Sequence, residues 1–203
     1  MKYKYLIILV FGLIFGFILG CQITNRDNHP QNTKQIGDKE KTEIIKYKQK
    51  YVPTKNEKGY CWTISIATPS NERAWKCFVG NFIHDPCFET EDGKIVCDVD
   101  PEVGGSGFEL KLTKDLPPRE GPFLEIDQPW LVKFDNGIIC GAITGSAGFI
   151  GEDSFHYSCD KEAVILGEIN TDNPIWTAMV GYPTKDYESL AKEENLEIIK
   201  VWK

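Results

Sequence analysis

From Gly59 to the C-terminus the chain alternates between large apolar residues and small or polar ones. In residues 60–67 the side chains of Tyr60, Trp62 and Ile64 fall on one side of an extended backbone. A period of two is typical of a half-buried β-strand. The same pattern predicts further strands at residues 107–113, 128–134, 138–143, 155–159, 163–167, 175–182 and 196–202.

Two short segments between predicted strands indicate tight turns. Asp135-Asn136-Gly137 separates residues 128–134 from 138–143, and Asp92-Gly93 lies between Cys87 and Cys97. Asp-Gly and Asn-Gly are strong hairpin signals, because these turns need residues that adopt a positive φ. In a three-residue turn with Gly93 in the left-handed conformation, Cys87 lies opposite Cys97.

We also predict two short helices. Ser70 can cap a helix that ends near Lys76, and a second helix covers residues 185–194. The many short strands, separated by Gly, Asn and Pro, favour an antiparallel sandwich or barrel. The predicted fold is therefore mainly β, sandwich or barrel-like, with two short helices and disulfide staples.

Seven cysteines are more than an intracellular chain of 203 residues normally keeps. Without Cys21 an even set of six remains, as a disulfide framework requires, with fifteen formal pairings. Cys140 and Cys159 end two apolar strands beside a glycine-rich loop and form the second expected pair after that of the hairpin. Cys61 with Cys77 follows by elimination. No two cysteines have zinc-ligand spacing, so no metal site is predicted. The six are Cys61, Cys77, Cys87, Cys97, Cys140 and Cys159.

The N-terminus has the layout of an export signal. Lys2 and Lys4 precede an apolar run at residues 5–20, which is shorter than the roughly 20 residues of a spanning helix. The run ends in Leu19-Gly20-Cys21, which resembles the lipobox of bacterial lipoproteins. That resemblance implies cleavage before Cys21 and acylation of its side chain; the alternative is an uncleaved membrane anchor. In both cases the rest of the chain lies outside the cytoplasm.

The chain divides into residues 1–21, 22–58 and 59–203. The middle part reads as a polar stalk, because it lacks Trp, Phe and Cys and has little apolar surface to offset the entropy of ordering. Within it, residues 42–51 are the part that could form a short helix or an added strand.

Charge is distributed unevenly over these parts. The stalk holds nine basic and five acidic side chains, whereas residues 59–203 hold twelve basic and twenty-five acidic ones. A basic stalk is attracted to an anionic bilayer, and an acidic domain is repelled by polyanions. Nucleic acid is therefore not an expected partner.

A run of motifs lies between Cys61 and Cys97. It comprises Cys61-Trp62-Thr63, Ala74-Trp75-Lys76-Cys77, Val79-Gly80-Asn81 and Asp85-Pro86-Cys87-Phe88. These motifs resemble a group of small secreted or lipid-anchored proteins of Gram-positive bacteria. The resemblance covers most of the chain after Gly59. It implies export and a cysteine framework, and it brings no catalytic residues.

Two functions from different classes remain. The first is a non-enzymatic binding module that takes an envelope component or a protein ligand; the second is a hydrolase that cleaves cell-wall glycan with paired carboxylates. His84 precedes the turn-like dipeptide Asp85-Pro86 and is expected in an exposed loop, so no catalytic residue and no cofactor is predicted. The candidate binding residues are Trp75, on the first predicted helix, and the acidic residues Glu89, Glu91, Asp98 and Asp100.

Overall fold

The computed structural model describes residues 41–119 and 128–203, all of which belong to one compact unit, Gly37–Lys203. The predicted signal and lipidation site at residues 1–21 lie outside the described residues, as does the first part of the predicted stalk.

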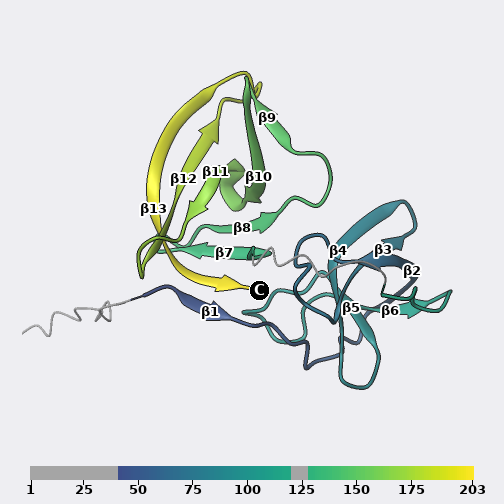
Figure 1. Cartoon of the computed structure of the whole chain (residues 1–203). Coiled ribbons are helices and arrows are strands. Elements are labelled where there is room, and N and C mark those ends of the chain that lie inside the picture. The colour runs from purple at the N-terminus through teal and green to yellow at the C-terminus, as the bar shows by residue number, and fades with distance from the viewer. Residues whose placement is uncertain (1–40, 120–127) are drawn as a thin grey trace, which may run out of the picture. The chain divides into compact units, whose positions relative to one another are not determined.

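The first half of the described chain forms a closed five-stranded barrel (Figure 1). Successive strands pair antiparallel, and the last strand pairs with the first in parallel orientation. A Cβ atom at Gly59 would lie 2.0 Å from the carbonyl oxygen of Phe78, so only glycine allows this approach of two neighbouring strands. The strands are β2 (Asn56–Ile64), β3 (Ala74–Val79), β4 (Phe82–Glu89), β5 (Ile95–Cys97) and β6 (Phe108–Leu112).

The second half forms a sheet whose two ends also meet. It contains β7 (Leu131–Phe134), β8 (Ile139–Ala142), β9 (Gly148–Ile150), β10 (Asp153–Cys159), β11 (Val164–Asn170), β12 (Trp176–Pro183) and β13 (Leu190–Trp202). The strand order is β13-β12-β11-β10-β8-β7, and β7 pairs with β13 again. β9 adds to β10 outside this path. The second sheet therefore closes on itself, which confirms a mainly β, barrel-like fold.

The three expected disulfides are confirmed. Each joins directly opposed residues of neighbouring strands, and Gly93 has a φ of 78°, as the hairpin register requires. Two bridges lie in the five-stranded barrel and the third joins β8 to β10. The pairs are Cys61–Cys77, Cys87–Cys97 and Cys140–Cys159.

Ordered structure begins before Gly59. β1 (Glu43–Ile45) pairs in parallel with the end of β13. Thr42 is buried, donates its hydroxyl to the Ile198 carbonyl at 2.6 Å and accepts from the Trp176 amide at 2.8 Å. Of the two options for residues 42–51, the added strand is the one that forms, and the folded part includes the end of the segment that reads as a stalk.

The two predicted helices are wrong. Residues 74–76 belong to β3, because the bridge from Cys77 to Cys61 and the inward side chain of Trp75 both need an extended backbone. At residues 185–194, side-chain hydrogen bonds around Thr184 close a turn, and β13 then begins and pairs with β12. In the described ranges the helical structure is the 3₁₀ turn Asp160–Glu162.

An apolar cluster joins the barrel to the second sheet. Phe88 of β4 packs with Trp130, which precedes β7, and with Tyr47, which follows β1; their ring centroids lie 5.2 and 4.7 Å from that of Phe88. Lys76 of β3 reaches the same boundary and donates to the Thr144 carbonyl at 2.5 Å. The packing of Tyr47 on Phe88 fixes the segment after β1 against the barrel. The buried members of the cluster are Ala67, Ala74, Phe88, Trp130 and Trp202.

Candidate functional site

A groove of about 820 Å³ lies between the segment that joins β1 to β2 and one end of the barrel. One wall is the extended segment 46–52. The other is formed by the loop 70–73 and by the turn 89–92, which joins β4 to β5. The two walls come from parts of the chain that the sequence pattern assigns to different segments, so only the folded structure brings them together.

The first wall carries a row of lysines. All five residues 46–50 border the groove, but Lys46, Lys48 and Lys50 are exposed, whereas Tyr47 is partly buried and Gln49 is buried. An extended backbone places alternate side chains on opposite sides, with about 7 Å between successive residues of one side. Within the described ranges none of these three lysines has an ion-pair or hydrogen-bond partner.

Buried contacts hold the lysine row in place. The Tyr47 ring packs edge-on against Phe88 and Trp130, and its hydroxyl donates to the side-chain carbonyl of Gln49. Burial, with a smaller contribution from the nearby charge of Asp100, raises the pKa of Tyr47 to about 12. Tyr47 therefore stays neutral at any physiological pH, and the row does not change shape through its ionisation.

The second wall is acidic. Glu72, Glu89, Glu91 and Asp92 all line the groove, and Arg73, which donates to the Thr90 carbonyl at 3.0 Å, is a basic residue of the same wall. Glu89 accepts a hydrogen bond from the Trp75 indole at 3.3 Å and lies 3.6 Å from the Arg119 guanidinium. The Thr90 hydroxyl donates to Asp92 and holds the pKa of that carboxyl below its usual value. The groove thus has a cationic wall facing an anionic one.

The predicted binding residues separate in the structure. Glu89 and Glu91 line the groove, but Asp98 lies 2.7 Å from Nδ1 of His84 elsewhere on the barrel. Asp100 borders a smaller hollow of about 160 Å³ beside the loop 100–106. His84 belongs to β4 and packs edge-on against a barrel phenylalanine, so the expectation of an exposed loop residue is wrong.

Trp75 is not a surface residue. It is 3% exposed, belongs to the barrel core and has the Arg119 guanidinium 4.4 Å from its ring. The tryptophan that reaches the surface of the barrel is Trp62, whose ring stacks on Phe78 at 4.2 Å. Trp75 and Cys77 both point into the barrel, so the motif Ala74-Trp75-Lys76-Cys77 contributes to packing of the barrel core.

The lysine row was missed by sequence reasoning. The alternation Lys46-Tyr47-Lys48-Gln49-Lys50 has the same period of two as the predicted strands. This alternation is compatible with an extended segment, but the segment has so few apolar residues that its composition predicts disorder. The apolar surface that orders it belongs to Phe88 and Trp130, far along the chain.

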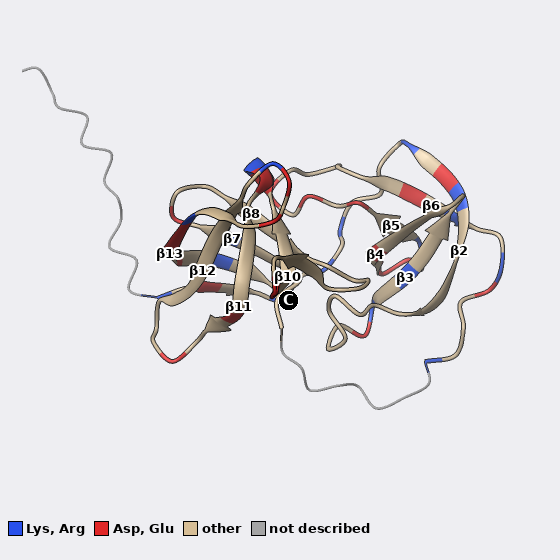
Figure 2. Cartoon of the chain, turned by 90° about the horizontal axis from the view of Figure 1, so that it is seen from above, with Lys and Arg blue, Asp and Glu red and all other residues tan. Residues whose placement is uncertain are grey.

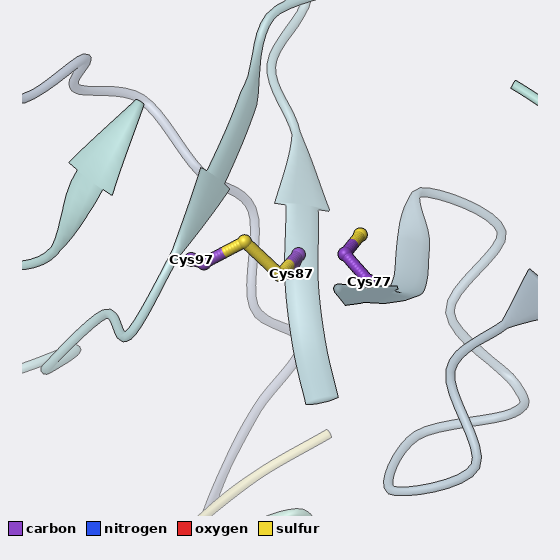
Figure 3. A group of neighbouring side chains, drawn as sticks. All are labelled: Cys77, Cys87 and Cys97. Carbon is purple, nitrogen blue, oxygen red and sulfur yellow. A yellow bond between two sulfur atoms is a disulfide. The ribbon is translucent and has the colours of Figure 1, made fainter. Parts of the chain in front are cut away.

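Three cysteine sulfurs lie close together in the barrel. The Sγ atoms of Cys77, Cys87 and Cys97 are all within 4.8 Å of one another. Figure 3 shows the bonded sulfurs of Cys87 and Cys97 and the nearby sulfur of Cys77. Thiolates at such distances can bind zinc. Here Cys87 is bonded to Cys97 and Cys77 to Cys61, so the sulfurs are used in covalent bonds.

Negative charge is shared by the barrel and the second sheet, whereas the segment before β2 is basic. Residues 41–119 carry twelve basic and twelve acidic side chains, whereas residues 128–203 carry six and twelve. Figure 2 places Asp and Glu on β11 and β13 and in the loops that join the strands of this sheet. The balance within residues 41–119 comes from the five lysines of residues 41–55, because residues 56–112, which form the barrel, carry five basic and ten acidic side chains.

No family model, curated protein or solved structure matches the chain. Across residues 41–119 and 128–203, no helix has the length and apolar character to span a bilayer.

Proposed function

We propose that the protein is a lipid-anchored lipoprotein on the extracytoplasmic face of the cell membrane. There it acts as a non-enzymatic binding module whose groove takes an extended peptide segment of another envelope protein. The observation that carries this proposal is the row of Lys46, Lys48 and Lys50, unpartnered in the described chain, facing Glu91 and Asp92 across one groove. Asp92 does pair with Lys94, at 3.2 Å, but both side chains are about half exposed.

The spacing of the lysine row favours an extended peptide. In a peptide strand, side chains of one side recur every two residues, about 7 Å apart, and the exposed lysines of residues 46–50 recur with the same period of two. Acidic side chains on one face of the ligand would meet the lysines, and basic ones on the other face would meet the opposite wall. Arrangements of this kind give specificity and fast association more than high affinity.

The alternative, a carboxylate-dependent glycan hydrolase, has less support. Such an enzyme needs one carboxyl that stays protonated as general acid. The raised pKa in the barrel belongs to Asp85, whose side chain is fully buried and bonded to Ser65 and to the Ile66 amide. In the groove, the pKa of Asp92 is lowered, which suits a permanent negative charge.

Replacing the three groove lysines tests the binding proposal. The full chain in detergent is titrated with a fluorescent peptide of alternating Glu and Thr residues, and anisotropy is measured at low salt. The change K46Q/K48Q/K50Q should weaken binding about tenfold, since each exposed charge contact contributes roughly 0.5 kcal/mol.

The matched control is K161Q/K185Q/K192Q, which removes three exposed lysines from the second sheet. It should bind the peptide as the wild type does. If wild type ignores the peptide, or if both triple variants bind equally, the groove is not the binding site.

The anchor is tested separately. Cys21→Ser removes the thiol that acylation would use, so acyl labelling should be lost and the chain should leave the membrane fraction or accumulate uncleaved. Metabolic labelling with a fatty-acid analogue and fractionation measure both effects. Unchanged labelling of the variant would rule out lipidation at this residue, and an uncleaved N-terminal anchor or a secreted form would then replace it.

A further inference from the structure

The end of the barrel away from the groove exposes apolar side chains. Phe82 and Ile83, at the start of β4, are 74% and 51% exposed, and Leu112, at the end of β6, is 36% exposed. Large apolar side chains are normally exposed singly. Here strand pairing groups them, because Gly59 is the register partner of both Val79 and Leu112, and Val79 is the partner of Phe82.

Three lysines lie on the side of this apolar tip that β2 and β6 form, next to Leu112. Lys58 and Lys111 are register partners one position before Gly59 and Leu112, and both are exposed. Lys114 lies 4.0 Å from the ring of Tyr60 on the next rung of β2. Lys111 pairs with Glu109 at 2.6 Å, but that glutamate is 13% exposed, so the lysine is the more accessible charge.

Among residues 41–119, acidic groups at the tip are few and mostly paired. Glu57 pairs with Lys55 at 3.5 Å, and Asp115 is the exposed acid beside Lys114. The tip differs from its surroundings, because the barrel as a whole and the second sheet each have twice as many acidic as basic side chains. An anionic surface would therefore attract this end of the barrel and repel the other half of the protein.

We propose that this tip, formed by the β3–β4 turn with Phe82 and Ile83, by Leu112 and by the three lysines next to it, rests on the anionic phospholipid surface of the membrane. The side chains of Phe82 and Ile83 enter the boundary between headgroups and acyl chains, and Lys58, Lys111 and Lys114 contact lipid phosphates. This inference rests on the membrane anchoring proposed above.

Chain length and charge both favour the bilayer as the partner that contacts the apolar tip. From Cys21 to Thr42 the chain can extend at most about 70 Å, so an anchored barrel stays within reach of the bilayer that holds it. Aromatic and aliphatic side chains with lysines beside them suit the interface of a membrane that contains anionic lipid.

The proposed contact also orients the groove. Phe82 begins β4 and Glu89 ends it, and a strand of this length spans roughly 20 Å. With the tip on the membrane, the lysine row and the acidic wall point away from the lipid, where a protein ligand can reach them.

Hydrogen exchange of the full chain in vesicles tests the contact. The wild type is reconstituted in phosphatidylcholine vesicles with and without phosphatidylglycerol. Amide exchange of residues 79–84 should be slower in the anionic vesicles, and F82S/I83S should abolish the difference. Removal of each lysine, as in K58Q or K114Q, should weaken the contact about fivefold.

Phe149→Ser is the matched control, because Phe149 is 62% exposed on β9 of the second sheet. It should leave the protection of residues 79–84 unchanged. Equal exchange in the two vesicle types, or equal protection in wild type and F82S/I83S, overturns the membrane contact. Failure of the chain to incorporate into any vesicle would instead contradict the anchor, and the peptide titration in detergent tests the groove independently of both.

Discussion

Lys76→Met should lower the free energy of unfolding by about 3 to 5 kcal/mol, the usual cost of leaving one partner of a buried ion pair uncompensated. The Lys76 side chain is 8% exposed, and its Nζ lies 3.8 Å from Asp85, whose side chain is fully buried. Methionine fills a similar volume, so the loss comes from charge and hydrogen bonding rather than from a cavity. Chemical denaturation at neutral pH measures it.

Asp85 explains why the effect should be large. Its carboxylate accepts from the Ser65 hydroxyl at 2.5 Å and from the Ile66 amide at 3.1 Å. Burial is the largest influence on its pKa and raises it, whereas Lys76 acts in the opposite direction. Without Lys76 the buried carboxylate keeps its desolvation cost and loses its nearest positive charge.

The same pair sets a pH dependence. Because the folded-state pKa of Asp85 is raised above 3.8, its contribution to stability is present below the unfolded pKa and is lost as the pH rises through the folded pKa. Lys76→Met raises the folded pKa further. The destabilisation by this variant should therefore be large at neutral pH and shrink under mildly acidic conditions.

A double-mutant cycle measures the interaction between Lys76 and Asp85 separately from the other contacts of Lys76. Lys76→Met combined with Asp85→Asn removes both charges, and should be less destabilised than the sum of the single variants. If the effects add, or if Lys76→Met is as stable as the wild type, the two charges do not stabilise each other. The contact of Lys76 with the Thr144 carbonyl would then account for any remaining effect.

Phe88→Ala should cost about 3 to 5 kcal/mol, as other truncations of buried aromatic residues do. Phe88 is 1% exposed and contacts both Tyr47 and Trp130. Its loss leaves a cavity where the barrel, the segment 46–52 and the second sheet meet. Urea denaturation measures the cost, and faster hydrogen exchange at residues 46–50 should accompany it, because Tyr47 loses its packing.

Phe149→Ala is the comparison, since an exposed side chain normally contributes less than about 0.5 kcal/mol. Phe149 is 62% exposed. A loss for Phe88→Ala no greater than that for Phe149→Ala would show that the cluster does not join the two halves. An unchanged exchange rate at residues 46–50 would show that Phe88 does not hold the lysine row in place.

Local patterns in the sequence were sufficient to predict the elements that depend on neighbouring residues. Alternation located most strands of the second sheet, because a strand with one buried face repeats every two residues. Asp92-Gly93 was enough to place Cys87 opposite Cys97, since a turn type and a positive φ at glycine fix the register of a hairpin.

Other features depend on contacts between residues far apart in the sequence and become visible in the fold alone. Residues 74–76 and 190–194 have helix-compatible composition, yet pairing with β2, β4 and β12 makes them strands. Residues 46–50 have too little apolar surface to order themselves and are held by Phe88 and Trp130. Burial and strand pairing depend on the whole fold, so local composition could not predict the groove and its lysine row. It did predict two of the four groove acids, Glu89 and Glu91, as binding residues.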